Sequence, residues 1–457
     1  MRHVVLVLAL AAPGAQAAVS EFTLGNGLKV LVKEDHRAPI VVTQVWYKVG
    51  SSYEHDGLTG ISHALEHMMF KGTEKHPAGE FSRIISVNGG SENAFTGSDY
   101  TAYFQTLEKS RLEVSLELEA DRMRNLTLPS AEFDKEINVV KEERRWRTED
   151  EPQAFAFEVL QATAFQTSPY RHPIIGWMAD LDAMHIEDVQ QWYRRWYAPN
   201  NAVLVVAGDV KPEAVRTLVE KYFGALQPDD VAPPQPRPEI AQAGLKRVTV
   251  KRPAELPYLI MAWKTPVLNT TRDPGGVAAG WEPYALAVLA GILDGGSSAR
   301  FATKLVRGQE VAVDIGADYQ PAARLDGLFT IDGTPSQGHD VAALEAAVHA
   351  QLEDLKQTLV ELSELERVKA QVVSHDVYQK DSVFYQALLL GTFESVGLPW
   401  RLSEEYVERV QAVTAEQVRE VARRYFDDEH LTVAVLDPQP IDPNRPPHSP
   451  EDMGHVR

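Results

Sequence analysis

The sequence of 457 residues contains no cysteine. Disulfide bonds are therefore excluded, and so is every metal site that depends on thiolate ligands. A metal ion bound by this chain must be held by His, Asp or Glu side chains. A chain of this length can still bury enough apolar surface to fold without disulfides, even in an oxidising compartment.

Long hydrophobic runs are also scarce. The run Val4–Ala12 is too short for a bilayer-spanning helix, which needs about 20 apolar residues. It follows the basic Arg2 and precedes a small-x-small cleavage sequence at Ala15 and Ala17, which predicts a secretory signal peptide over residues 1–17. A buried N-terminal strand is the alternative, but it explains neither the basic start nor the cleavage sequence. We therefore expect a secreted protein, periplasmic if the host is Gram-negative, with no membrane span in the mature chain.

Basic side chains are the minority among the charged residues. There are 45 Lys and Arg against 65 Asp and Glu, which gives a formal net charge of -20. Such a surface repels a phosphate backbone, so no nucleic-acid partner is expected. The composition, 44% hydrophobic and 24% charged, is that of a soluble globular protein. The length suits two domains of about 200 residues each.

Two similar stretches indicate an internal duplication. The sequence EDVQQWYRRWYAPNNAVLVVAGD (187–209) aligns without a gap on EQVREVARRYFDDEHLTVAVLDP (416–438). The offset between these two stretches also places Phe155 on Phe384. Chance similarity between two helix–strand units is the alternative, but one offset in both regions favours duplication of a domain.

Proline-rich segments mark the limits of the two copies. Residues 228–238 hold five prolines and are typical of a stiff, exposed connector. Strands and helices alternate in each copy without a strict βαβ order, which predicts an α+β fold with a helix-covered sheet. The predicted organisation is a signal peptide (1–17), an N-terminal domain (18–227), a linker (228–240), a C-terminal domain (241–438) and a disordered tail (439–457).

The strongest candidate for chemistry is the sequence His63-Ala64-Leu65-Glu66-His67, on a helix predicted over residues 59–71. Residues four apart lie on one face of a helix, so His63 and His67 can both offer a nitrogen to one ion. The alternative is a solvated helix face that happens to carry two histidines. A third ligand is required, and the candidate is Glu143 on a later predicted helix, with Glu136 two helical turns earlier on the same face.

This pattern of HxxEH followed by a distant glutamate resembles the inverzincin zinc metallopeptidases, the family of insulinase, pitrilysin and the β subunit of mitochondrial processing peptidase. The resemblance implies that His63, His67 and Glu143 bind one Zn²⁺ per chain and that Glu66 is the general base. Glu136 would support the site through one of these ligands without binding the metal itself. It also implies two homologous domains, each a largely antiparallel sheet layered with helices, which form a clam-like shell around a cavity.

The resemblance extends to the sequence GGSENAFTGSDYTAYF (89–104). In the family this is an edge strand beside the metal that pairs with an extended substrate. It implies that Asn93, Ala94 and Phe95 bind substrate and that Phe95 helps to form an apolar pocket. A plain hairpin strand is the alternative.

The second copy lacks the metal motif. Single-chain family members carry Arg-x6-Tyr in this half, where the pair holds the substrate. Here the candidate arginine is Arg307, but Asp314 stands in the place of the tyrosine, and Tyr319 follows twelve residues after the arginine. We therefore expect a heterodimer with a homologous chain that lacks the zinc motif, with a homodimer as the second choice.

Together these features predict a zinc-dependent endopeptidase that cleaves extended peptides or unfolded segments. A non-catalytic peptide-binding or scaffold subunit of the same fold is the alternative. Such subunits usually lose one of the motif residues, and all four are present here.

Overall fold

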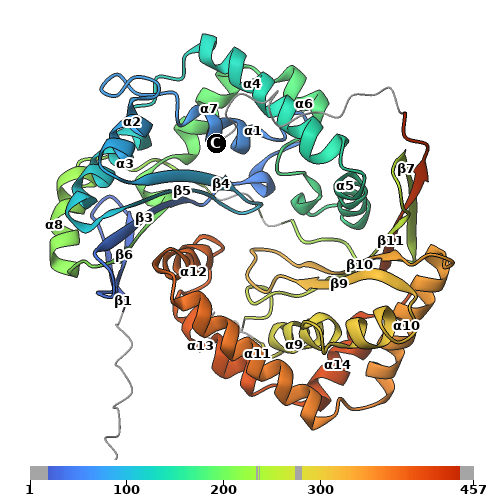
Figure 1. Ribbon diagram of the computed structural model, residues 1–457. Helices are drawn as coiled ribbons and strands as arrows, with labels where there is room; N and C mark the ends of the chain where they lie inside the picture. Colours follow the sequence, from blue (N-terminus) through green and yellow to red (C-terminus); the bar gives the residue numbers. More distant parts are fainter. Residues whose placement is uncertain (1–18, 233–234, 236, 273–279, 443–457) are drawn as a thin grey trace, which may run out of the picture.

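The computed structural model describes residues 19–232, 235, 237–272 and 280–442. The predicted signal peptide and most of the predicted tail lie outside these residues. The described chain forms two β-sheets, each layered with helices, that face one another across the molecule (Figure 1). We call residues 19–232 the first half and residues 237–442 the second half.

The first sheet has six strands in the order β1-β2-β6-β3-β5-β4. Strands β2 and β6 run parallel, and the other neighbours are antiparallel. β1 and β2 form a hairpin, with Gly27 of the turn in the left-handed region at φ 88°. The strands are β1 (Val19–Thr23), β2 (Lys29–Glu34), β3 (Ile40–Tyr47), β4 (Ser91–Thr96), β5 (Thr101–Glu108) and β6 (Ala202–Gly208).

Helices of the first half pack on one face of this sheet and enclose its main hydrophobic core. The core includes Leu65 and Met68 of the helix that carries the two histidines, so that helix is fixed by burial of its apolar side. The helices are α1 (Ile61–Met68), α2 (Glu80–Val87), α3 (Leu112–Arg124), α4 (Ser130–Arg144), α6 (Met178–Ala183), α7 (Ile186–Trp196) and α8 (Pro212–Phe223).

The second sheet has five strands in the order β7-β11-β8-β10-β9, again with one parallel pair, β7 and β11. Its strands are β7 (Lys246–Pro253), β8 (Tyr258–Thr265), β9 (Ala312–Tyr319), β10 (Gly327–Pro335) and β11 (Leu431–Gln439). Its helices are α9 (Glu282–Asp294), α10 (Val341–Gln357), α11 (Leu362–Lys380), α13 (Arg401–Gln411) and α14 (Ala415–Tyr425).

The two halves repeat one topology. Without β1, the strand order of the first sheet corresponds, strand for strand in chain order, to that of the second. Helices α7 and α14 occupy equivalent positions in the two aligned stretches, and each starts with a reciprocal capping box, His185 with Asp188 and Thr414 with Gln417. The predicted α+β fold of two homologous domains is confirmed.

Each half places one helix on the sheet of the other. Helix α5 (Pro152–Ala164) packs through Ala156 and Leu160 on the second sheet, and α12 (Val383–Ser395) packs through Ala387 and Leu390 on the first (Figure 1). These two contacts bury the face of each sheet that its own helices leave open. The halves are therefore interlocked rather than merely tethered by the linker.

The end of the linker is fixed by its last acidic side chain. The Glu239 carboxylate accepts hydrogen bonds from the backbone N–H groups of Gln166, Thr167 and Ser168 at 2.8–3.0 Å. It also accepts a hydrogen bond from the Thr167 hydroxyl at 3.2 Å and forms an ion pair of 2.7 Å with Lys264 of β8. Burial alone would raise the pKa of Glu239, but these contacts hold it at about 2. The connector therefore joins both halves at this point instead of running free.

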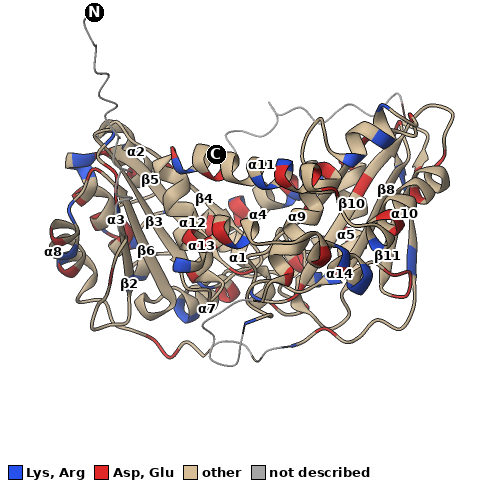
Figure 2. Ribbon diagram, turned by 90° about the horizontal axis from the view of Figure 1, so that it is seen from below, with Lys and Arg blue, Asp and Glu red and all other residues tan. Residues whose placement is uncertain are grey.

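One helix is shorter than the sequence predicts: the helix predicted over residues 59–71 spans Ile61–Met68. A tight turn joins β4 to β5. Acidic residues are distributed over both halves (Figure 2). No helix within the described ranges is long and apolar enough to cross a bilayer.

Candidate metal centre

The start of α1 is fixed by a buried carboxylate. Glu54 accepts hydrogen bonds from the backbone N–H groups of Gly60 at 2.7 Å and Ser62 at 2.9 Å, so it satisfies donors that a helix N-terminus leaves open. Gly60 is at φ 83°, and a Cβ there would lie 2.5 Å from the carbonyl oxygen of Ile175. Only glycine fits this position, and the orientation of the histidine-bearing helix follows from it.

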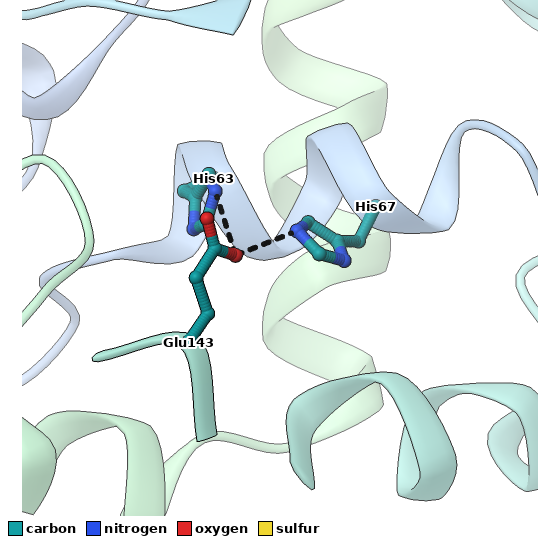
Figure 3. A group of neighbouring side chains, drawn as sticks. All are labelled: His63, His67 and Glu143. Carbon is teal, nitrogen blue, oxygen red and sulfur yellow. Dashed lines mark ion pairs between the residues drawn. The ribbon is translucent and has the colours of Figure 1, made fainter. Parts of the chain in front are cut away.

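The side chains of His63, His67 and Glu143 converge on one point (Figure 3). The Oε2 atom of Glu143 lies 3.6 Å from Nε2 of His63 and 3.3 Å from Nε2 of His67. The three potential ligand atoms all lie within 4.8 Å of one another. Helix α1 supplies both imidazoles and the last turn of α4 supplies the carboxylate, as the sequence spacing predicts.

This group fits a zinc ion. Two imidazoles and one carboxylate are a donor set that zinc uses when it keeps a further position open. Glu143 Oε2 is buried and receives no well-directed hydrogen bond, although both imidazole nitrogens point towards it. A buried carboxylate oxygen without a donor is costly unless a cation satisfies it. The donor chemistry and the orphaned oxygen both match a divalent cation bound between the three side chains.

The surroundings of the two histidines shift their pKa values in opposite directions. Burial, together with the neighbouring His67, lowers the pKa of His63 to about 3, so its imidazole is neutral and available as a ligand. Burial would also lower the pKa of His67, but the neighbouring carboxylates of Glu136 and Glu143 raise it to about 9. A metal ion must therefore displace a proton from the metal-free site.

Glu136 contacts Nδ1 of His67, the ring nitrogen that does not face Glu143. Its Oε2 lies 3.2 Å from Nδ1 of His67, and its Oε1 forms an ion pair of 2.6 Å with Lys71. Burial would raise the pKa of Glu136, but these two contacts lower it. The carboxylate is thus ionised and fixes the ring so that Nε2 faces Glu143.

Glu66 lies on the same helix, beside the candidate metal ligands and at the wall of a cavity. Its Oε2 accepts a hydrogen bond from the hydroxyl of Thr96 at the end of β4. Burial raises the pKa of Glu66. A carboxylate with a raised pKa and a fixed orientation is suited to accept and return a proton.

Arg147 was not anticipated from the sequence. It lies in the π-helical turn Arg145–Glu149 that follows α4, and its Nη1 forms an ion pair of 2.7 Å with Oε1 of Glu143. This contact occupies the oxygen that faces away from the histidines. A spacing of four residues on a helix could have suggested the pair. Glu142, by contrast, is exposed and pairs with Arg145, as expected for a surface charge.

A cavity of about 660 Å³ opens onto these side chains. Its lining belongs entirely to the first half and includes Asn93, Ala94 and Phe95 of β4. β4 is the last strand of its sheet, so within the described residues its outer edge has no strand partner. The Ala94 N–H donates to the side-chain oxygen of Asn93 at 2.9 Å, and Phe95 packs edge-on against Trp46. The three predicted substrate residues thus lie together at the metal pocket.

The described part of the second half offers no equivalent site. Among the residues that the structure describes, it holds no group of three His, Asp or Glu side chains close enough to share an ion. Arg307 is exposed and donates to the carbonyl of Ser297, and Asp314 is exposed on β9. Tyr319 is buried and its hydroxyl donates to the carbonyl of Pro266 at 2.6 Å. Tyr319 is therefore committed to the core of its own half.

The chain is similar to known proteins over most of its length. A model of the insulinase family (peptidase family M16) matches residues 29–177, and one of the peptidase M16 inactive domain matches residues 183–372. The zinc protease PqqE of Helicobacter pylori is 31% identical over 91% of this chain and 92% of its own. The crystal structure of a protease from Helicobacter pylori superposes with a TM-score of 0.86 at 29% identity, over 92% of this chain and 100% of that chain. The periplasmic protease PqqL from Escherichia coli shares the fold, with a TM-score of 0.76 at 17% identity, over 95% of this chain and 49% of that chain. As the HxxEH resemblance predicts, the chain belongs to the insulinase family, peptidase family M16.

Proposed function

We propose that this protein is a zinc-dependent endopeptidase that hydrolyses peptide bonds in extended peptides or unfolded segments. The observation that carries the proposal is the convergence of His63, His67 and Glu143 beside the buried Glu66 at the wall of one cavity. The family membership and the names of the relatives support the same activity. A cavity of this volume takes a few residues of an extended chain.

His63, His67 and Glu143 would hold the zinc ion. When bound, zinc supplies a Lewis acid that polarises the scissile carbonyl and lowers the pKa of water. Glu66 accepts a proton from the attacking water as the water oxygen bonds to the carbonyl carbon. The same carboxylic acid then donates that proton to the nitrogen of the leaving amine as the C–N bond breaks. Thr96 keeps the Glu66 carboxylate directed into the cavity throughout, through its hydrogen bond.

The outer edge of β4 would bind the substrate backbone. The Ala94 N–H is directed away from β5 and is capped by the Asn93 side chain. A substrate carbonyl can replace that side-chain oxygen and add a strand to the sheet. Phe95 would then contact an apolar substrate side chain. Asn93→Ala is expected to alter KM more than kcat, because this contact is made before the chemical step.

The activity is tested with zinc-loaded protein lacking residues 1–17 and a library of quenched fluorescent peptides. We expect about one zinc per chain, bound through three protein ligands, and cleavage that is lost in Glu66→Gln while zinc remains. Glu143→Gln should lose zinc, whereas its neighbour Glu142→Gln should keep both zinc and cleavage. Bound zinc without cleavage under any condition would favour a peptide-binding subunit. Absence of zinc would refute the proposal.

We also propose that the active form is a heterodimer with a homologous chain that lacks the zinc motif. The cavity at the metal centre is lined only by the first half, and Arg307, Asp314 and Tyr319 of the second half are engaged elsewhere or exposed. In PqqL, the region that this fold matches is about half of a longer chain, which is consistent with such pairing. Full cleavage by a monomeric chain would contradict the heterodimer, and activity of a self-associated chain would favour the homodimer.

We propose that this activity is exerted after export, in the periplasm if the host is Gram-negative. The support is the basic, apolar and small-x-small pattern of residues 1–17. Sequencing of the N-terminus of protein purified from its host tests this, because export predicts a start at Ala18. A start at Met1 would contradict it.

A further inference from the structure

One arginine of the second half enters the first half next to the metal pocket. Arg324 lies between β9 and β10, and its guanidinium Nε is 3.3 Å from Oδ1 of Asp99. Its Nη2 donates to the hydroxyl oxygen of Ser52 at 2.8 Å, and its backbone N–H donates to Oδ2 of Asp99 at 3.0 Å. Asp99 belongs to the turn between β4 and β5. The contact therefore joins two segments that are far apart in the sequence.

The network around Asp99 is closed and buried. The hydroxyl groups of Ser52 and Tyr170 both donate to the Asp99 carboxylate, and the side chain of Asp99 is only 4% exposed. The hydroxyl of Tyr170 also accepts the backbone N–H groups of Arg324 and Leu325. A buried carboxylate needs such a partner, because an unpaired charge in this environment is strongly unfavourable.

The three first-half segments that meet Arg324 all form part of the metal site. Ser52 lies two residues before Glu54, which caps α1. Asp99 lies three residues after Thr96, which orients Glu66. Tyr170 precedes Arg171, a residue of the cavity wall.

Backbone hydrogen bonds tie these segments to one another as well as to Arg324. The Ser51 N–H donates to Gly97 O at 3.2 Å and the Ser52 N–H donates to Ser98 O at 2.8 Å. A displacement of Asp99 therefore also shifts the turn that directly follows Thr96. The same change reaches the segment that leads to α1.

We propose that Arg324 is a positioning residue through which the second half orders the catalytic loops of the first. This inference rests on the proposed peptidase function. It assigns to the second half a part in the reaction that the Arg-x6-Tyr pattern does not describe, since Arg324 acts on Asp99 and Ser52 rather than on the substrate. The half without a metal site is then needed for catalysis as well as for enclosing the cavity.

A second ion pair between the halves provides a matched control. Lys29 of β2 pairs with Glu394 of α12 at 2.8 Å, and both side chains are largely shielded from solvent. Neither residue lines the cavity at the metal centre. Lys29→Met therefore removes a contact between the halves without touching the catalytic loops.

The test compares Arg324→Met, Arg324→Lys and Lys29→Met in the zinc-loaded chain with its partner. We expect Arg324→Met to keep zinc and to lower kcat by roughly 10- to 100-fold with little change in KM, because small displacements of reacting groups carry penalties of that size. Arg324→Lys should recover part of the rate, since lysine can pair with Asp99 but cannot also reach Ser52. Lys29→Met should leave kcat unchanged.

Two further measurements exclude a general folding defect. The double variant Arg324→Met with Asp99→Asn leaves no buried charge unpaired, and it should still have the low kcat. Combining Arg324→Met with Thr96→Val should lower kcat by less than the product of the single effects, because both act on the orientation of Glu66.

Hydrogen exchange separates failure of this inference from failure of the peptidase proposal. Arg324→Met should speed exchange in residues 50–62 and 91–101, and Lys29→Met should not, whether or not any peptide is cleaved. Unchanged exchange in these segments would overturn the positioning role. So would wild-type kcat in Arg324→Met, or an equal loss of kcat in Lys29→Met. A wild-type chain that never cleaves would overturn the peptidase proposal instead.

Discussion

Gly391 has no side chain, and this allows α12 of the second half to pack closely against Trp46 of the first sheet. A Cβ added at Gly391 would lie 2.1 Å from both Cε2 and Nε1 of Trp46. Ordinary carbon contacts are about 3.5–4.0 Å, so the overlap exceeds an ångström. On helix propensity alone, Gly391→Ala would stabilise the chain by about 1 kcal/mol. The structure predicts the opposite sign.

The surroundings of Trp46 set the size of the effect. Its ring is fully buried, its Nε1 donates to Oε1 of Gln44 at 3.0 Å, and it packs edge-on against Phe95 and Tyr100. Moving the ring breaks the hydrogen bond, at about 1 kcal/mol, which offsets the propensity gain. Overpacking then costs about 1–3 kcal/mol, so Gly391→Ala should lower the free energy of unfolding by that amount.

Urea and thermal denaturation of the metal-free chain measure this effect. A domain of this size loses about 2–4 °C in Tm for each kcal/mol. Ser374→Ala, at an exposed position of α11, is the control and should not lower the Tm. A Tm for Gly391→Ala that equals or exceeds that of the wild type would refute the close approach of α12 to Trp46.

Three further predictions concern the supports of the metal site. Glu136→Gln should weaken zinc binding by about 10- to 100-fold in a chelator competition, because His67 loses its partner; unchanged affinity would contradict this role. Arg144→Met should cost about 3–5 kcal/mol in urea unfolding, because the buried Glu158 loses its two hydrogen bonds of 2.8 and 2.9 Å; a loss below about 1 kcal/mol would contradict the buried pair. Burial raises the pKa of Glu54 from 4.5 to about 7, so the folded chain binds this proton more tightly than the unfolded chain. The free energy of unfolding should therefore fall by about 2–4 kcal/mol between pH 4.5 and 7, and Glu54→Gln should remove this part of the pH dependence. An identical pH profile in the variant would contradict it.

The convergence of His63, His67 and Glu143 could be predicted because their geometry is local or belongs to a family pattern. His63 and His67 share a face of one helix by spacing alone, and Glu136 and Glu143 follow from the spacing of the resemblance. The duplication of the domain could be predicted from the sequence for a similar reason. A fixed offset between two amphipathic units survives sequence divergence, since each copy must bury the same face.

The contacts between the halves could not be predicted in this way. Arg324 meets Asp99 from the other half of the chain, and neither residue lies in a periodic pattern that would indicate a partner. Gly391 is an ordinary helix position in the sequence, and only the docked Trp46 makes a side chain there impossible. Tyr319 is likewise buried in the core of the second half, and its spacing from Arg307 in the sequence does not indicate this burial.

The most direct test of the proposed peptidase is cleavage of a quenched fluorescent peptide by the zinc-loaded chain, with its partner, in wild-type and Glu66→Gln forms of equal zinc content. The wild type should cleave the peptide, and Glu66→Gln, with zinc still bound, should lose roughly 10²- to 10⁴-fold in rate. Equal cleavage by the two forms would contradict the role of Glu66, because the base would then lie elsewhere. Failure of the wild type to cleave with zinc and partner both bound would contradict the proposed peptidase itself.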